Sequence, residues 1–168
     1  MSFELVDLDG TLVLEGDKPN AELIAYMAED AASEGTQFIV VSARNIDRLD
    51  ETKAWLADNN VPAIAEIHLN DFEGSPFATG VEFKAYKVKK LLEDGYEIDY
   101  GIDNDPAVRE AYRTLGIEAY TWQQVVAGEA NATNGEGEAA AAADTLDPDA
   151  ATNRENVDMR EREMRAMP

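Results

Sequence analysis

Residues 3–12 read FELVDLDGTL, an apolar run that ends in two aspartates and a glycine. The apolar part, Phe3–Leu8, is expected to form a β-strand. Alternation along an extended chain then places Asp7 and Asp9 on the same side of it. Gly10 permits a tight turn directly after them. Two carboxylates are therefore expected to converge where the first strand ends.

Apolar runs and helical patterns alternate along residues 1–126, which is typical of βα units in a parallel sheet. Further strands are expected at 37–41, 63–69, 98–102 and 117–121, and helices at 21–33, 48–59, 84–93 and 106–115. Doubly wound sheets of this kind bind ligands at the carboxyl ends of their strands. We therefore predict a Rossmann-like, doubly wound α/β fold with a functional site at that edge.

Length and composition exclude several classes of protein. The 168 residues, 45% of them hydrophobic, suit one domain of ordinary size. The sequence has no cysteine and one histidine, which excludes disulfides, thiolate zinc sites, a cysteine nucleophile and multi-histidine metal sites. No apolar stretch is long enough for a membrane span, and the N-terminus does not resemble a signal peptide, so a cytoplasmic protein without membrane contact is expected.

The charge is strongly acidic: 35 acidic against 14 basic residues give a formal net charge of −21. Such a surface repels itself unless salt screens it, which favours a protein adapted to high salt, such as a phage or viral protein of a high-salt host. An ordinary acidic protein is the alternative. Residues 127–168 contain no aromatic residue and one leucine, so we expect a disordered acidic tail there, after a folded domain at 1–126.

Polar groups follow the other expected strands as well. Ser42 and Arg44 supply a hydroxyl and a guanidinium, which suit phosphate. Lys84 is expected to open a helix, where its charge and the helix dipole have the same sign. Residues 103–105 (DND) supply the hard oxygen ligands that Mg²⁺ takes. Two acidic strand ends around a cation-lined pocket predict a phosphoryl-transfer site.

In this order, VDLDGTLV, VVSAR, the helix-opening Lys84 and IDND resemble the four motifs of the haloacid dehalogenase-like (HAD) phosphatase superfamily. Within it, the sequence is most similar to the 3'-phosphatase domain of phage polynucleotide kinase-phosphatases. That similarity is carried by SAR before a Trp-bearing helix and by YEIDYGIDND leading to VREAYRTLGIEAYTW. The resemblance covers residues 3–126. It implies a Mg²⁺-dependent phosphomonoesterase that works through an aspartyl-phosphate and removes 3'-phosphate from nucleic-acid ends.

The resemblance also implies roles for individual residues. Asp7 would be the nucleophile, and Asp9 the general acid that protonates the leaving oxygen and then the base that activates water. Ser42 and Lys84 would hold the transferring phosphoryl oxygens. The implied substrate-binding residues are Thr11, Lys18 and Arg44.

The metal site that the resemblance implies is incompletely defined. Mg²⁺ would be held by Asp7, by the backbone carbonyl of Asp9 and by the fourth motif. Relatives often carry two adjacent acids in that motif, whereas here Asp103 is followed by Asn104 and then Asp105. The ligand among these three residues stays open.

The spacing of the motifs bears on the substrate. Ordinary elements fill the intervals 9–42 and 42–84, so no cap domain is expected. Open sites in this superfamily resemble those that act on polymer ends, which favours a phosphorylated nucleic-acid end. A nucleotide or another small phosphoester is the alternative, as are a non-catalytic phospho-accepting domain and a scaffold. No G-x-x-x-x-G-K-[ST] loop is present, which excludes a kinase activity in this sequence.

Overall fold

The computed structural model describes residues 2–72 and 79–130. The chain divides into two compact units at the junction between Trp122 and Gln123. In the second unit the described residues are 123–130, where helix α5 (Trp122–Val126) ends in a turn. Most of the predicted tail, residues 131–168, lies outside the described residues. No helix among residues 2–72 and 79–130 has the length and apolar character that a membrane crossing requires.

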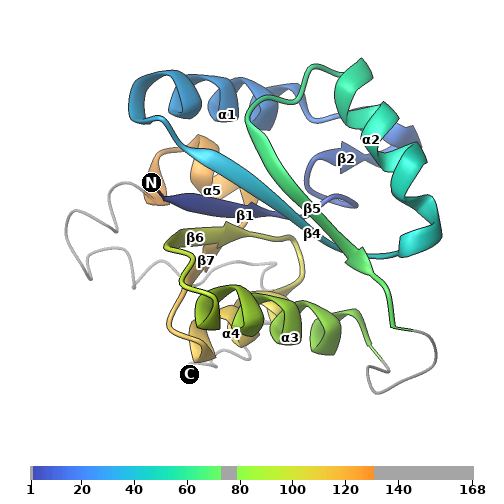
Figure 1. Cartoon of the computed structure of the whole chain (residues 1–168). Helices are drawn as coiled ribbons and strands as arrows, with labels where there is room; N and C mark the ends of the chain where they lie inside the picture. Colours follow the sequence, from blue (N-terminus) through green and yellow to red (C-terminus); the bar gives the residue numbers. More distant parts are fainter. Residues whose placement is uncertain (1, 73–78, 131–168) are drawn as a thin grey trace. The chain divides into compact units, whose positions relative to one another are not determined.

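A five-stranded, wholly parallel sheet runs through the first unit (Figure 1). Its order is β5-β4-β1-β6-β7, and each strand is hydrogen-bonded in parallel to its neighbours. The central strand β1 therefore lies between the strands that carry the second and fourth motifs. The five strands are β1 (Phe3–Val6), β4 (Gln37–Asn45), β5 (Ile64–Asn70), β6 (Ile98–Ile102) and β7 (Glu118–Tyr120).

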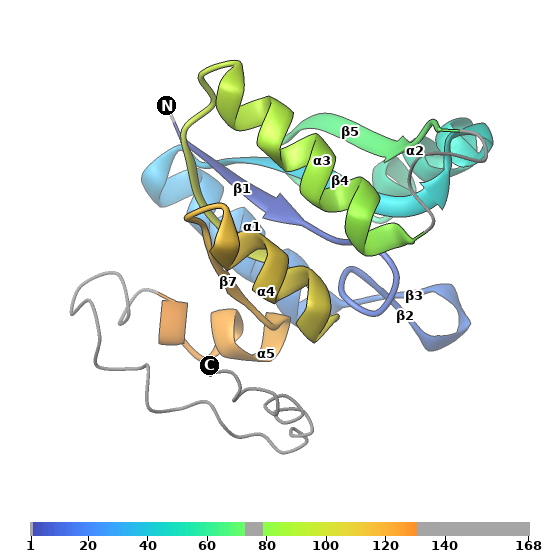
Figure 2. The ribbon, with the colours of Figure 1, turned by 90° about the horizontal axis from the view of Figure 1, so that it is seen from below.

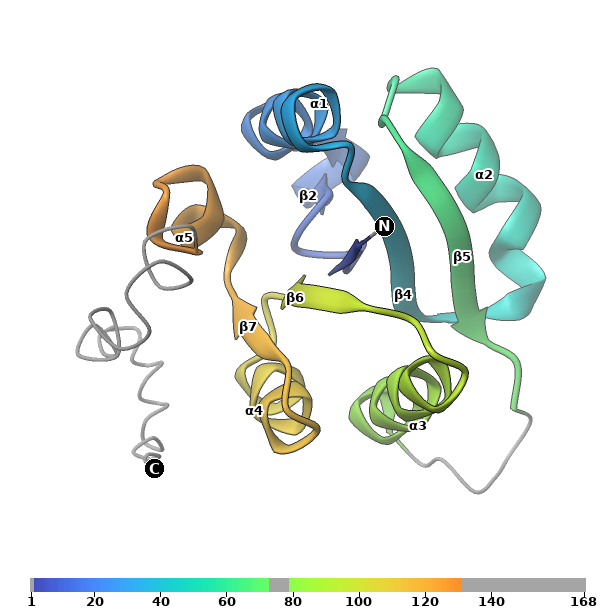
Figure 3. The same ribbon diagram turned by 60° about the vertical axis from the view of Figure 1, so that its left-hand side comes forward.

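Helices cover both faces of this sheet. Figure 3 shows α1 (Ala21–Glu34) and α2 (Leu49–Asp58) on one face and α3 (Gly80–Glu93) and α4 (Pro106–Thr114) on the other. In Figure 2 the second pair lies side by side over the sheet. This arrangement confirms the predicted doubly wound α/β fold, and the described residues include no separate cap domain.

Two strand boundaries and a hairpin differ from the predictions. Strand β1 ends at Val6 rather than Leu8, whereas β4 continues beyond Val41 to Asn45 because it pairs with β5 as far as Asn70. An antiparallel hairpin that the sequence did not predict is formed by β2 (Val13–Leu14) and β3 (Lys18–Pro19), which have two residues each. They are too short to show an alternating pattern.

The start of α3 is a further correction. The helix begins at Gly80 and not at Lys84, because the Thr79 hydroxyl accepts a hydrogen bond from the Glu82 N–H (3.1 Å) and caps it. Lys84 therefore lies in the second turn, away from the helix terminus. The prediction that it opens the helix was wrong.

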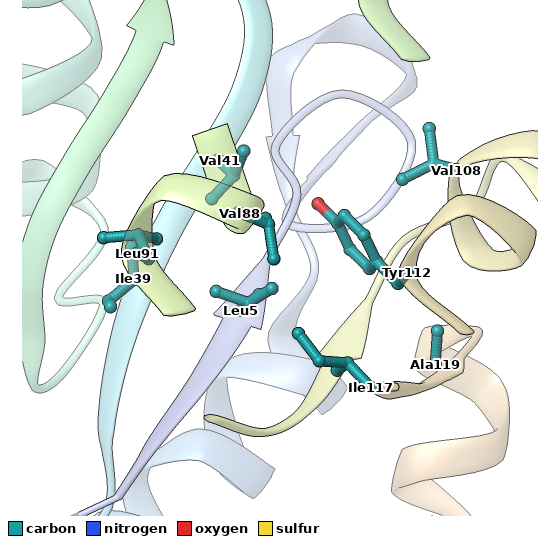
Figure 4. Packing of buried hydrophobic residues seen from close by; sticks show 9 residues of the cluster. All are labelled: Leu5, Ile39, Val41, Val88, Leu91, Val108, Tyr112, Ile117 and Ala119. Atoms are coloured by element: carbon teal, nitrogen blue, oxygen red, sulfur yellow. The ribbon is translucent and has the colours of Figure 1, made fainter. Parts of the chain in front are cut away.

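A hydrophobic core fixes α3 and α4 on the sheet (Figure 4). Strand residues such as Leu5 and Ile39 pack against Val88 of α3 and Tyr112 of α4, all of them at most 1% exposed. Gly101 of β6 permits this packing, since a Cβ there would lie 2.8 Å from the Tyr112 ring. Burying each such side chain contributes about 1.5–3 kcal/mol to the stability of the fold. The packed core therefore fixes the positions of the strand ends that carry the polar motifs.

A buried carboxyl pair lies on the opposite side of β1. Glu4 is 3% exposed, and its Oε1 and Oδ2 of Asp30 have no hydrogen-bond partner among the described residues. The hydroxyls of Tyr26 and Tyr100 hydrogen-bond to each other nearby. Burial, together with Asp30, raises the pKa of Glu4 to about 9. Glu4 is therefore protonated in the folded protein at neutral pH.

This protonation makes stability depend on pH. The folded pKa of Glu4 lies above the unfolded value of 4.5, so folding takes up a proton between these pH values and stability falls as the pH rises toward 9. The slope for one proton is about 1.4 kcal/mol per pH unit. We expect Glu4→Gln to remove this slope, so that the variant gains stability over the wild type with each unit from pH 6 to 9. Urea unfolding at each pH measures the free energy of unfolding of both proteins, and the variant Glu97→Gln, at an exposed position, is the control. Equal slopes in all three proteins would contradict the assignment.

Candidate functional site

A pocket of about 420 Å³ lies where β1, β4 and β6 end. It gathers side chains from positions 7, 9, 42, 44, 84 and 103–105, although these are spread over almost one hundred residues of sequence. The structure thus brings together eight of the ten predicted site residues, namely Asp7, Asp9, Ser42, Arg44, Lys84, Asp103, Asn104 and Asp105.

A buried ion triad forms the floor of the pocket. The Lys84 ammonium donates to Oδ1 of Asp7 at 2.8 Å and to Oδ2 of Asp103 at 2.6 Å. The three side chains are 6%, 6% and 1% exposed. Two backbone hydrogen bonds hold the aspartates at the sheet edge, from the Asp7 N–H to the Ile102 carbonyl and from the Asp103 N–H to the Tyr120 carbonyl.

The triad has one negative charge in excess. Burial raises the pKa of Asp7, and burial together with the charge of Asp7 raises the pKa of Asp103 to about 7. Burial disfavours the charge of Lys84, but Asp103 and Asp7 outweigh it and raise the pKa of the ammonium. Two carboxyl groups thus share one ammonium group, so the triad has a net charge of −1 when both carboxyl groups are ionised.

Thr11 and Lys18 do not line the pocket. Thr11 is fully buried, and its hydroxyl donates to Oδ2 of Asp7 at 2.9 Å while its carbonyl accepts from the Asn20 amide at 2.8 Å. In this structure Thr11 therefore orients Asp7 rather than facing a substrate. Lys18 is exposed on the short strand β3. The Trp55 indole N–H donates to the carbonyl of Asp17 at 3.1 Å and so ties this hairpin to α2.

Asn104 contacts the first motif. One terminal atom of its amide lies 2.9 Å from Oδ2 of Asp7 and 3.3 Å from the Asp9 carbonyl oxygen. If that atom is nitrogen, it donates to both oxygens; if it is oxygen, as a bound cation requires, it lies beside two other oxygens. Adjacent ligands of an octahedral Mg²⁺, at about 2.1 Å from the ion, lie about 3.0 Å apart, so these two separations suit this ion.

The other two members of the fourth motif, Asp103 and Asp105, already accept hydrogen bonds. Asp103 accepts from Lys84 with one oxygen and from the Asp105 N–H with the other. Asp105 accepts from the Ala107 N–H at 2.9 Å and caps α4. Among residues 2–72 and 79–130, no three His, Cys, Asp or Glu side chains form a cluster suited to a metal. Beside the Asp7 carboxylate, the oxygens that could hold a metal without breaking these contacts are the Asn104 amide and the Asp9 carbonyl.

Gly10 makes the approach of Asn104 possible. It has φ +88°, and a Cβ there would lie 2.4 Å from Nδ2 and 2.8 Å from Cγ of Asn104. An alanine would strain the backbone and displace the amide from the group of oxygens. Gly16 offers a matched control, because it also has a positive φ (+76°) but nothing within 4 Å of its Cβ position.

We expect Gly10→Ala to weaken Mg²⁺ binding at the pocket about tenfold, the usual loss when the support of a metal ligand is disturbed. Gly16→Ala shares the backbone strain and should leave Mg²⁺ binding unchanged. A Mg²⁺ titration followed by isothermal calorimetry measures both. An identical titration curve for Gly10→Ala and the wild type would show that Asn104 does not belong to the metal site.

Arg44 pairs with Asp9. Its guanidinium donates to both carboxylate oxygens, Nε at 2.9 Å and Nη2 at 2.8 Å, and its third nitrogen donates to the Thr52 hydroxyl at 3.0 Å. This hydrogen-bonded pairing lowers the pKa of Asp9. The Ser42 hydroxyl accepts from the Arg44 N–H at 3.1 Å. Asp9 is 58% exposed and Arg44 only 6%, so the carboxylate is the partner with room to move.

Three residues of the site were missed in the sequence. Thr52 holds Arg44, Asn20 holds the loop that contains Thr11, and Arg109 donates to the Asp103 carbonyl at 3.0 Å. The only signal for Asn20 was its place before an expected helix, which is typical of a cap. Thr52 and Arg109 lie within helices, and nothing in their local sequence marks them.

Fold and site together define an open, doubly wound α/β protein with an acidic pocket at the carboxyl edge of its sheet. No family model matches the sequence, and no curated protein matches it. Among solved structures, a chain of the Pnkp1/Rnl/Hen1 RNA repair complex superposes with a TM-score of 0.59 and 20% identity, covering 71% of this chain and 42% of that chain. A second structure of this complex gives the same values over 45% of its chain.

An uncharacterized protein from Corynebacterium glutamicum superposes with a TM-score of 0.49 and 16% identity, covering 80% of this chain and 93% of its own. This chain spans less than half the length of the repair-complex chains that it matches. At these identities the likeness concerns the fold.

Proposed function

We propose that this chain is a Mg²⁺-dependent phosphomonoesterase that forms an aspartyl-phosphate on Asp7 and removes 3'-phosphate from nucleic-acid ends. The observation that carries the proposal is the environment of Asp7. One of its oxygens accepts from the buried Lys84, and the other accepts from the Thr11 hydroxyl and lies 2.9 Å from the Asn104 amide. A carboxylate held in this way presents one oxygen for attack beside a cation that can receive phosphate.

Charge balance supports a divalent cation. The pocket lining contains four aspartates and two cationic side chains, Arg44 and Lys84, which gives a formal charge of −2. Mg²⁺ would be held by Oδ2 of Asp7, the carbonyl oxygen of Asp9 and the Asn104 amide oxygen. When bound, the ion neutralises the site and shields the phosphate from the attacking carboxylate. Of the three candidates in the fourth motif, Asn104 is the one that this proposal selects.

The first chemical step follows from the contacts of Asp7. Its Oδ1 attacks phosphorus, the bond from phosphorus to the leaving oxygen breaks, and the phosphoryl group passes to the carboxylate. Lys84, which already contacts Oδ1, holds a phosphoryl oxygen, and the Ser42 hydroxyl at the pocket wall donates to another. A protonated Asp9 gives its proton to the leaving oxygen.

The Arg44 contact governs Asp9. While both Asp9 oxygens accept from Arg44, the carboxylate stays ionised, so it becomes an acid only when this pair separates. The arriving phosphate is a competing acceptor for Arg44, which agrees with the substrate role that the sequence implied. In the second step the ionised Asp9 takes a proton from the water that attacks the aspartyl-phosphate, and phosphate leaves.

Two further observations support a nucleic-acid end as the substrate. The described residues include no cap domain, so the pocket is open to a bulky chain. The solved structures with the higher TM-scores belong to an RNA repair complex. A nucleotide or another small phosphoester is the second candidate, because the same pocket would accept it.

The test is phosphate release with Mg²⁺, in low and in molar salt, from three substrates: a 3'-phosphorylated oligonucleotide, a 5'-phosphorylated one and an aryl phosphate. We expect the 3'-phosphorylated strand to have the highest kcat/KM. Release from the aryl phosphate alone would support the phosphatase reaction and contradict a nucleic-acid substrate. Stable phosphorylation without turnover would identify a phospho-accepting domain, and no reaction at all would favour a scaffold.

A further inference from the structure

The lysines of this acidic chain are concentrated on one helix. Four of the six lie on α3; Lys84 is buried in the ion triad, and the other three against two glutamates leave a formal charge of +1 on the rest of the helix. Its neighbour α4 has +1. On the other face of the sheet α1 has −4 and α2 has −2. The helices on the two faces of the sheet in Figure 3 thus differ in formal charge, and a polyanion would be repelled less from α3 and α4 than from α1 and α2.

The lysines of α3 lie on two different flanks. Phe83, Tyr86, Lys87 and Lys90 are spaced i, i+3, i+4 and i+7, so they share one side of the helix. Glu82, Lys89 and Glu93 share another, where Lys89 donates to Glu93 at 2.9 Å. Glu93 pairs with Lys89, although it also lies within the electrostatic reach of Lys90, three residues before it. We call Tyr86, Lys87 and Lys90, of which Lys87 is half-buried, the α3 flank.

Aromatic rings underlie the α3 flank. Phe83 is fully buried, and the Lys87 ammonium lies 6.0 Å from the centre of its ring. Phe72, which follows β5, packs edge-on against Tyr86 with ring centres 5.4 Å apart. The Tyr86 side chain is nevertheless 37% exposed. A partly exposed ring beside two lysines combines the two features with which proteins bind single-stranded nucleic acid, a stacking surface and cations.

The α3 flank begins beside the pocket. The first two turns of α3 contribute Lys84 to the ion triad, and Gly80 approaches Ala43 of the pocket wall so closely that a Cβ would lie 2.7 Å from the Ala43 Cβ. In Figure 2 the helix runs back from this edge over the sheet. Helical side chains lean toward the N-terminus of their helix, so Lys87 is directed back along α3 toward the pocket end.

We propose that the α3 flank binds the nucleic-acid strand on the 5' side of the terminal phosphate, with Lys87 and Lys90 on backbone phosphates and Tyr86 stacked on an unpaired base. The inference rests on the proposed function, since it places the 3'-phosphate at Lys84. It goes further by assigning a single-stranded chain as the substrate and a direction of approach over the α3 and α4 face. Lysine contacts with phosphate do not read sequence, so binding should be tolerant of sequence.

The test measures binding rather than turnover. A fluorescent single strand of about twelve nucleotides with a 3'-hydroxyl, the product of the proposed reaction, is titrated with the full chain and followed by anisotropy. We expect Lys87→Ala/Lys90→Ala to weaken binding about tenfold, as for two surface ion pairs of up to about 1 kcal/mol each. The slope of log affinity against log salt should fall by about 1.4, the value for two phosphate contacts to a single strand.

Lys89→Ala is the matched control, because it removes the same charge from the same helix on the flank where Lys89 pairs with Glu93. It should change the affinity less than twofold. Tyr86→Ala should weaken binding at every salt concentration without changing the slope, since stacking releases no counterion. Unfolding transitions of all variants show whether the fold is kept, and Lys87→Glu/Lys90→Glu should give a larger loss than the alanine pair.

Three outcomes would overturn the inference: no binding of the strand by the wild type, equal losses in the alanine pair and in Lys89→Ala, or an unchanged salt slope in the pair. Failure of the proposed function is a separate result. The chain could bind the strand through the α3 flank and yet release no phosphate from a 3'-phosphorylated strand. That result would support the binding surface and contradict the proposed reaction.

Discussion

Asp7→Asn should lower phosphate release by at least about a thousandfold, a loss typical of removing a catalytic nucleophile. Asparagine keeps the shape of the side chain, and its oxygen can still accept from Lys84. It has no carboxylate to attack phosphorus, and it removes one of the charges that would hold Mg²⁺. Phosphate release from an aryl phosphate at saturating Mg²⁺ measures the loss.

The variant should fold normally. Asp7 and Asp103 are two buried carboxylates on one ammonium, and removing one of them relieves the excess of negative charge. We therefore expect Asp7→Asn to be at least as stable as the wild type without metal. Asp17→Asn, an exposed change on the hairpin, is the control for both measurements. Activity within tenfold of the wild type in Asp7→Asn would exclude Asp7 as the nucleophile.

Lys84→Met should destabilise the metal-free protein by about 3–5 kcal/mol, because it leaves two buried carboxylates without their cation. Lys84 lowers the pKa of both carboxyl groups, so these pKa values rise when it is removed, and at pH 8 a buried carboxyl must either stay charged without its cation or take up a proton. Urea unfolding in a chelator measures this free energy of unfolding. Activity should be lost as well, since the ammonium is the group that would receive the phosphoryl oxygens.

Lys89→Met provides the comparison, because Lys89 forms an exposed ion pair with Glu93 on the same helix. Exposed pairs of this kind contribute little to stability, because water and salt screen them. Adding Mg²⁺ should restore part of the stability of Lys84→Met by supplying a second cation to the site. Equal destabilisation of the two variants would mean that the triad does not hold the site together.

The sheet could be predicted because its signal is local. Buried parallel strands are continuous apolar runs, such as residues 37–41, and helices between them show a period of 3.6 residues. Boundaries were less accurate where they depend on tertiary contacts. Thr79 caps α3, but the glycine after it disfavours a helix, so the helical pattern became visible only near Lys84. The two-residue strands at 13–14 and 18–19 are too short for any periodicity.

The set of pocket residues could be predicted because strand order brings carboxyl ends together, but their partners could not. Asp7 and Asp9 both line the pocket, although β1 ends before them and strand alternation is not the reason. The pairing of Arg44 with Asp9 depends on Thr52, a helical residue with no local signal. Likewise, Asn104 and Asp105 look equivalent in sequence, and only the contacts separate a residue that faces Asp7 from a helix cap.

The central claim is that the Asp7 carboxylate becomes phosphorylated. Rapid acid quenching of the wild type mixed with a ³²P-labelled 3'-phosphorylated oligonucleotide and Mg²⁺ tests it most directly. We expect label on the protein within the first turnover, released by hydroxylamine as an acyl phosphate should be, located by peptide mapping at Asp7, and absent in Asp7→Asn. Phosphate release at full rate with no label on the protein, or label at another residue, would contradict the account.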